Sequence, residues 1–227
     1  MWIDDEVLVR SDQAVVSEAF IVGKPLVVLG AANKPELEVN LEVCHKQNVE
    51  VSKRYGGGGT VVLYDGCVGA RAGLWVKDKF KNDFYFEKIN DSLIQTIQNS
   101  FRGLPELSQR GISDLCVGEQ KFCGTSMFRS RNYLLFQASI IVDLDLELVS
   151  SLLAHPSKEP DYRKGRSHKD FLTSLSQFTE MSPAELRDIL NGNWGANLRQ
   201  SMVSELIEPV SAQIPHLLKR ANSTQGG

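Results

Sequence analysis

The chain lacks the features that mark membrane, nucleic-acid-binding and disulfide-stapled proteins. No apolar run approaches the roughly 20 residues that a bilayer span needs, and a formal net charge of −3 provides no basic surface for nucleic acid. The 227 residues include only 4 cysteines, and their scattered positions are typical of reduced thiols in a cytoplasm. We therefore expect a cytoplasmic protein that binds no nucleic acid and no membrane.

Metal-ligand patterns and targeting signals are also missing from the sequence. The spacing between Cys116 and Cys123 does not match a zinc site, and the 4 histidines form no ligand cluster. The N-terminal residues 1–6 (MWIDDE) are acidic and do not follow the pattern of a signal peptide. With 42% hydrophobic and 23% charged residues, the composition is that of a globular domain with a sizeable core.

The most informative stretch that is present is a run of four glycines between two apolar, β-branched segments: Gly56, Gly57, Gly58 and Gly59. Residues without Cβ let the backbone approach a ligand closely, although each costs about 0.5–1 kcal/mol relative to alanine in regular structure. No GK[ST] and no helix start follows, which argues against a P-loop or a dinucleotide fingerprint. Two interpretations stay open: a glycine-rich hairpin turn, and a ribbon that wraps a ligand.

A second stretch, 111–126, places Lys121 at a strand start and follows it with glycine and small hydroxyl residues. This arrangement suits a phosphate, because an ammonium about 4 Å from a phosphate oxygen contributes roughly 4 kcal/mol at an effective dielectric near 20. Taken alone, the segment fits a solvated surface lysine at a hairpin better than a phosphate site.

Hydrophobic periodicity predicts an α+β protein in which strands pair locally and helices lie between them. Strands are expected over 25–30, 48–53 and 60–64, and as an antiparallel meander over 112–117, 121–124 and 132–142. Helices are expected over 36–47, 84–104, 145–154 and 167–178, and from a capping box at Ser182 to 191–192. A surface loop is expected over 157–166, further helix over 198–219 and a frayed tail over 221–227.

Together, the glycine and lysine stretches resemble the lipoate–protein ligase branch of the biotin/lipoate ligase superfamily. The family's glycine motif, R-[RP]-x-[ST]-G-G-x-x-V-[FLY]-H-D, aligns without gaps with 54–65 (RYGGGGTVVLYD). Its lysine motif, N-D-L followed by K-[IFV]-x-G-x-[SA], is similar to 113–115 (SDL) and 121–126 (KFCGTS). Three further segments are similar to family motifs in the same order, over 25–41, 134–146 and 165–175.

Several positions differ from the family's pattern. Tyr64 and Gln137 stand where the family has histidine, and Ser113 replaces asparagine. Ala138 and Ser139 replace a Gly-Thr pair. These differences bear on which substrate is used and on catalysis itself.

The resemblance implies a mixed or antiparallel sheet flanked by helices, as in the catalytic domains of biotin and lipoate ligases. It implies an acyl-protein ligase-like catalytic domain over 1–180, with a helical extension over 181–227 packed on the same domain. No separate accessory domain is expected, although a separate small accessory subunit is compatible with the resemblance.

The implied function is ATP-dependent ligation of lipoate, or a related medium-chain acid, to a lysine of a carrier domain through an acyl-adenylate. The cofactors would be ATP and Mg²⁺. The carriers would be lipoyl domains of 2-oxoacid dehydrogenase complexes or the H protein of glycine cleavage.

The resemblance also implies roles for individual residues. Lys121 would be catalytic and contact the acyl carbonyl and the α-phosphate, while Arg54 would orient a carboxylate or a phosphate. Asp114 would hold Mg²⁺ or help to place the nucleotide. The complete set of implied binding residues is Arg54, Gly56, Gly57, Gly58, Gly59, Thr60, Val61, Tyr64, Asp65, Ser113, Asp114, Gly124, Ser126, Gln137, Ala138 and Ser139. An acyl tunnel would come from Leu26, Val28, Val61 and Leu63, although these residues fit an ordinary core at least as well. The basic loop 163–169 would close on the adenylate or dock the carrier, unless it is simply a solvated loop.

Two other functions compete with ligation. An octanoyl or lipoyl transferase on the same fold needs no ATP and uses a cysteine thioester, but Glu106 and His155 stand at the positions of the two known cysteine types. Cys116 and Cys123 lie closer to Lys121 and are interpreted as packing thiols. The second competitor is a non-catalytic relative that binds lipoate or a nucleotide.

Overall fold

Two β-sheets form the framework of the computed structural model, which describes residues 12–155, 159–211, 213–215 and 217. The larger sheet is antiparallel, with six strands in the order β1-β5-β9-β8-β7-β6. Its strands are β1 (Val15–Phe20), β5 (Cys67–Trp75), β6 (Leu107–Arg110), β7 (Asp114–Val117), β8 (Gln120–Ser130) and β9 (Tyr133–Ile141). The smaller, three-stranded sheet has the order β3-β2-β4 and consists of β2 (Leu26–Leu29), β3 (Glu50–Lys53) and β4 (Val61–Leu63).

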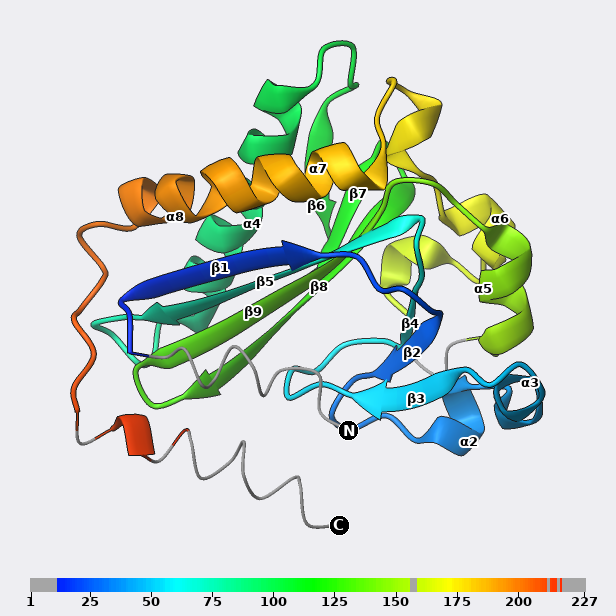
Figure 1. Cartoon of the computed structure of the whole chain (residues 1–227), viewed down its shortest axis with the longest axis horizontal. Coiled ribbons are helices and arrows are strands. Elements are labelled where there is room, and N and C mark those ends of the chain that lie inside the picture. Colours follow the sequence, from blue (N-terminus) through cyan, green and yellow to red (C-terminus); the bar gives the residue numbers. More distant parts are fainter. Residues whose placement is uncertain (1–11, 156–158, 212, 216, 218–227) are drawn as a thin grey trace.

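Helices flank both sheets, so the predicted α+β class is confirmed. Figure 1 shows α4, α7 and α8 along one side of the larger sheet, with the smaller sheet, α2 and α3 on the other. The helices are α2 (Pro35–Glu38), α3 (Leu41–Lys46), α4 (Asn82–Ser100), α5 (Leu146–Leu152), α6 (His168–Phe171), α7 (Pro183–Ile189) and α8 (Gly195–Ser201). Within the described part of the chain, no helix is long and apolar enough to cross a membrane.

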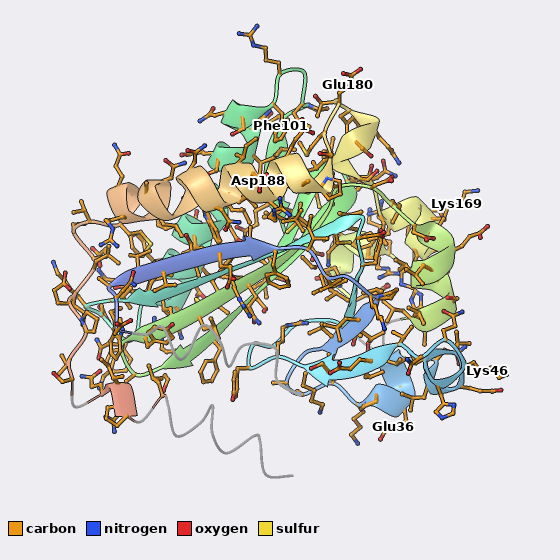
Figure 2. All side chains as sticks on the ribbon, in the orientation of Figure 1. Glu36, Lys46, Phe101, Lys169, Glu180 and Asp188 are labelled. Carbon is orange, nitrogen blue, oxygen red and sulfur yellow. The ribbon has the colours of Figure 1, made fainter. Side chains whose placement is uncertain are left out.

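The main core lies between α4 and the larger sheet. Tyr85, Ile89, Leu93 and Ile97 of α4 are fully buried, and their spacing of four residues places them on one helix face. The predicted helix 84–104 and the predicted meander are therefore confirmed, with the helix ending at Ser100. In Figure 2 the charged side chains of Glu36, Lys46 and Lys169 point outward from this framework.

The interpretation of the four glycines as a hairpin turn is wrong. The strands before and after them, β3 and β4, both pair with β2, in parallel and antiparallel respectively. Residues 54–60 therefore cross over the end of β2 instead of joining two neighbouring strands. We call residues 54–60 the glycine ribbon.

Several predicted helices have different bounds in the structure. The segment 36–47 forms two helices, because Val39 bridges to Leu153 in an extended conformation and the side chain of Asn40 caps the start of α3. The segment 167–178 contains α6 and a 3-10 turn at Leu175–Gln177 instead of one helix.

The capping box at Ser182 is confirmed, but the predicted helix end at 191–192 is wrong. A π-helical turn, Leu190–Trp194, continues α7 into α8. The side chain of Asn191 within this turn bonds both backbone groups of Ala19 on β1, so the Asn-Gly pair anchors the helix instead of ending it. Helix α8 ends at Ser201, and Leu206 forms an isolated β-bridge with Val76. The predicted helix 198–219 is therefore correct up to Ser201 and wrong around Leu206. The tail 221–227 lies outside the described residues.

Candidate active site

The glycine ribbon is held from inside by a buried arginine. The guanidinium of Arg54 donates from Nη2 to the carbonyl oxygens of Gly57 (2.8 Å) and Gly59 (2.6 Å), and from Nη1 to that of Val28 (3.3 Å). Arg54 is only 6% exposed. Its planar fork of donors suits several carbonyl oxygens at once. In this geometry Arg54 shapes the ribbon, whereas the sequence predicted that it would orient a carboxylate or a phosphate.

Glycine is required where the ribbon meets its surroundings. A Cβ on Gly30, just after β2, would lie 2.3 Å from the carbonyl oxygen of Gly58, and Gly58 itself has a φ of +91°. On the other side, a Cβ on Gly56 would lie 2.7 Å from Oγ of Ser126. The ribbon is thus packed between the end of β2 and the face of the larger sheet.

We expect Arg54→Lys to lower the free energy of unfolding by about 1.5–3 kcal/mol, because one ammonium cannot replace the fork that bonds several carbonyl oxygens. Urea unfolding monitored by circular dichroism measures the change. Arg187→Lys is the matched control, since that guanidinium pairs with the adjacent Asp188 at the surface. We call the contacts of the Arg54 guanidinium with the carbonyl oxygens the Arg54 clamp. Equal stability of the two variants would show that the Arg54 clamp is unimportant for folding.

Lys121 lies at the start of β8 and forms an ion pair across the ladder. Its Nζ lies 2.6 Å from Oδ1 of Asp114 on β7, and Oδ2 of Asp114 accepts a hydrogen bond from the hydroxyl of Tyr162 at 2.8 Å. An irregularity in the β7–β8 register between Leu115 and Cys116 places Asp114 opposite Gly124. A Cβ on Gly124 would lie only 3.0 Å from the Nζ of Lys121, so the glycine leaves room for the ammonium.

The glycine ribbon and Lys121 line the same cavity, whose volume is about 960 Å³. This volume is at the upper end of the range of small-molecule sites. Most of the residues implied by the resemblance line it: Arg54, Gly58, Gly59, Thr60, Val61, Ser113, Asp114, Lys121, Gly124, Ser126, Gln137, Ala138 and Ser139. Of the four residues suggested for an acyl tunnel, Val28, Val61 and Leu63 line it and Leu26 does not.

Four implied residues do not line the cavity: Gly56, Gly57, Tyr64 and Asp65. Successive side chains of β4 point to opposite faces of the sheet, and Val61 and Leu63 face the cavity. The chain that follows, with Tyr64 and Asp65, does not line it. Tyr64 is buried, and its hydroxyl donates to the carbonyl of Asp143 and accepts from the backbone N–H of Asp145. Burial raises the pKa of Tyr64 well above its usual value. Tyr64 thus ties β4 to the start of α5, away from the predicted site.

A row of polar side chains crosses the cavity side of the larger sheet. Glu18, Arg71, Gln137 and Ser126 are consecutive cross-strand partners on β1, β5, β9 and β8. Arg71 pairs with Glu18 at 2.9 Å, and Oγ of Ser126 donates to Oε1 of Gln137 at 3.1 Å. The sequence interpretation missed Arg71 because it assigned no strand to 67–75, where two glycines and an arginine obscure the hydrophobic pattern.

Other cavity residues were also missed. Asn33 and Glu38 both bond the hydroxyl of Thr60, at 3.2 and 3.5 Å, and therefore hold the end of the ribbon. Tyr162 lies in the predicted surface loop, of which only the basic residues were singled out from the sequence. The one feature of the sequence that could have pointed to Tyr162 is an aromatic side chain among polar neighbours. His168 was not missed, because it belongs to the basic loop 163–169 of the sequence analysis. It lines the cavity, and burial, followed by the charge of Arg163, lowers its pKa.

Asp114 is poorly placed to hold Mg²⁺. Both of its carboxylate oxygens are already engaged, by Lys121 and by Tyr162. Across the residues that the structure describes, no group of three or more His, Cys, Asp or Glu side chains gathers to hold a metal ion. Mg²⁺ is often bound through one or two carboxylates plus substrate phosphates, so the role of Asp114 toward Mg²⁺ stays a prediction.

Comparison with known proteins places the chain in a defined family. Residues 5–193 match the lipoyl protein ligase A/B catalytic domain family, so the chain belongs to that family. Among curated relatives, lipoate-protein ligase A subunit 1 of Thermoplasma acidophilum is 22% identical over 83% of this chain and 76% of its own length. Lipoate–protein ligase 1 of Staphylococcus aureus is 27% identical over 61% of this chain and only 41% of its own length.

Solved structures show the same fold. The bi-partite lipoate protein ligase of T. acidophilum, studied with its E2 lipoyl domain, superposes with a TM-score of 0.72 at 21% identity. That match covers 95% of this chain and 84% of the other. A lipoate-protein ligase A structure with bound ATP gives a TM-score of 0.70 at 19% identity, covering 95% and 85% of the two chains. The expected lipoate ligase fold is therefore confirmed.

Proposed function

We propose that this chain is an ATP-dependent lipoate–protein ligase catalytic domain, which activates lipoate or a related medium-chain acid as an acyl-adenylate. The observation that carries the proposal is the shared cavity, in which an ammonium, Lys121, and a closely packed glycine ribbon line one space. The names of the relatives and the ATP-bound structure of similar fold support it.

In the first step, an oxygen of the acid's carboxylate forms a bond to the α-phosphorus of ATP, and the bond to pyrophosphate breaks. Negative charge builds on the α-phosphate oxygens as pyrophosphate leaves. Lys121 would neutralise part of that charge, since phosphoryl transfer depends mainly on positioning and electrostatic stabilisation. Asp114 would keep the ammonium in place between the two steps.

In the second step, a carrier lysine amine attacks the acyl carbonyl, the new C–N bond forms, and AMP leaves with the electrons of the C–O bond. The amine releases its proton to solvent. Lys121 would donate to the carbonyl oxygen as it gains negative charge, in the manner of an oxyanion hole. The glycine ribbon would cover the mixed anhydride and exclude water that would hydrolyse it.

The proposed carriers are lipoyl domains of 2-oxoacid dehydrogenase complexes or the H protein of glycine cleavage. The T. acidophilum ligase of similar fold was studied with an E2 lipoyl domain, which supports the first of these. The same protein is described as bi-partite, and a curated relative is named as a subunit, which supports a requirement for a separate accessory subunit. Mg²⁺ would arrive with the phosphates of ATP. We further propose that 1–180 is the catalytic domain and that 181–227 is a helical extension of it.

Pyrophosphate release tests the proposed function. The protein is incubated with ATP, Mg²⁺ and, in separate reactions, lipoate, biotin or acids of graded chain length. We expect release that depends on both ATP and one class of acid. Calorimetric binding of acid and nucleotide without any pyrophosphate release would instead identify a non-catalytic binding protein.

The cysteines argue against the alternative of an ATP-independent transferase. All four are buried free thiols. Burial raises the pKa of each of these thiols, to about 12 for Cys67. Because the thiolate is the nucleophile, a buried thiol with a raised pKa is poorly suited to thioester formation.

We expect acyl transfer to survive replacement of each cysteine by alanine in turn: Cys44, Cys67, Cys116 and Cys123. Gel-shift or mass measurement of the modified carrier detects the product. A thioester route through one cysteine would instead be supported if wild type transferred an acyl group between carriers without ATP and the folded alanine variant of that cysteine did not.

A further inference from the structure

We infer that Tyr162 is a positioning residue for Lys121, which it holds in place through Asp114. The kinetic part of this inference rests on the proposed function, and it assigns to the loop before α6 a role in arranging the reacting groups. The residues involved come from β7, β8 and the 3-10 turn Asp161–Arg163.

The contact is a chain of two polar interactions. The hydroxyl of Tyr162 donates to Oδ2 of Asp114 at 2.8 Å, and Oδ1 of the same carboxylate lies 2.6 Å from Nζ of Lys121. Asp114 is only 5% exposed, so water has little access to compete for its oxygens. Burial raises the pKa of Tyr162, and its hydroxyl therefore stays protonated and able to donate.

The segment that carries Tyr162 also reaches Lys121 from a second direction. The backbone N–H of Thr173 donates to the carbonyl of Lys121 at 2.9 Å, and Leu172 bridges in parallel to Lys121. Between these contacts, the ring of Tyr162 lies 5.4 Å from that of Phe171, centroid to centroid. One segment therefore contacts both the backbone of Lys121 and, through Asp114, its side chain.

This double attachment matters because a lysine side chain has a flexible four-carbon stem and a compact charge without built-in direction. A catalytic donor is effective only when it is already aimed at the place where charge develops. A carboxylate with one oxygen fixed by Tyr162 can present the other to the ammonium in a single orientation. Without the tyrosine hydroxyl, Asp114 can turn, and the ammonium turns with it.

The test compares Tyr162→Phe with wild type and with Tyr85→Phe. The substitution keeps the ring that packs on Phe171 and removes only the hydroxyl. Tyr85 is a matched control, because its buried hydroxyl also contacts a carboxylate oxygen, Oε2 of Glu205, at 3.2 Å, in the core outside the cavity lining. Melting temperatures of all three proteins establish that each is folded.

The first readout does not depend on ligase activity. Brief labelling with acetic anhydride, followed by peptide mass spectrometry, reports how accessible each lysine amine is, with the exposed Lys169 as internal reference. We expect labelling of Lys121 to rise at least about threefold in Tyr162→Phe, because loss of one ordinary hydrogen bond shifts a conformational equilibrium by about that factor. Labelling of Lys121 should stay unchanged in Tyr85→Phe.

The second readout is the kinetics of pyrophosphate release. We expect kcat to fall roughly 10- to 100-fold in Tyr162→Phe, the range for a lost hydrogen bond to a charged group, while KM for ATP and for the acid hardly changes. Unchanged labelling of Lys121 overturns the inference, as does an unchanged kcat or a rise in KM alone. If wild type releases no pyrophosphate with any acid, the proposed function fails, and the labelling still decides whether Tyr162 positions Lys121.

Discussion

Lys121→Ala is expected to slow pyrophosphate release by about 10²–10³-fold, the usual effect of removing one preorganised donor from a site where charge develops. The alanine variant loses the side-chain amine that forms the ion pair with Asp114. It also leaves the buried Asp114 carboxylate with the hydroxyl of Tyr162 but without the ion pair to Lys121. Stopped-flow or coupled-enzyme measurement of pyrophosphate with the productive acid gives the rate.

Lys169→Ala is the matched control for this prediction. Lys169 is an exposed lysine on α6 that does not line the cavity, and Figure 2 shows its side chain pointing outward. We expect its rate to equal that of wild type. If Lys121→Ala is folded and as fast as Lys169→Ala, the assignment of Lys121 as the catalytic residue is wrong.

Gly30→Ala is expected to produce the largest structural effect of any single methyl group near the site. The added Cβ would lie 2.3 Å from the carbonyl oxygen of Gly58 and 3.2 Å from its carbonyl carbon. Both are backbone atoms, so either β2 or the glycine ribbon must move. Forcing extra atoms into a packed region typically costs about 1–3 kcal/mol. We therefore expect lower stability in urea and weaker binding of nucleotide and acid, as measured by calorimetry.

Gly23→Ala provides the comparison. A Cβ on Gly23, which precedes β2, would meet nothing within 4 Å, so the same chemical change is made without crowding. We expect that variant to bind and unfold like wild type. Binding by Gly30→Ala at wild-type affinity would show that the ribbon's position does not govern recognition.

The parts of the fold that could be predicted from the sequence are those with a local signature. Helix α4 repeats its apolar residues every four positions, and the start of α7 carries a complete capping box at Ser182 and Glu185. Strand β5 has no such signature, because it is buried along its whole length and contains Gly69, Arg71 and Gly73. Its place as an inner strand of the sheet follows from pairing with β1 and β9, which are far away in the sequence.

The residues of the candidate site likewise fall into those with a local sequence signature and those that depend on partners distant in the sequence. The sequence predicted Lys121 and the end of the glycine run as cavity residues, because close backbone approach and phosphate chemistry restrict the residue types at consecutive positions, and these residues line one cavity. Gly30 and Tyr162 were not found as site residues. Each acts on a partner distant in the sequence, Gly58 and Asp114 respectively, and a single sequence does not reveal that proximity. Arg54 was also predicted, and the structure adds its burial and its carbonyl partners, while its role toward a carboxylate or a phosphate stays a prediction.

The Arg54 clamp has a consequence for the thermodynamics of recognition. A loop of consecutive glycines that ordered only upon capture of its ligand would lose a large amount of backbone entropy at that moment. Here the chain has already lost that entropy during folding, since Gly57 and Gly59 are tethered to the guanidinium before any ligand arrives. Preorganisation of this kind leaves more of the interaction energy available as affinity.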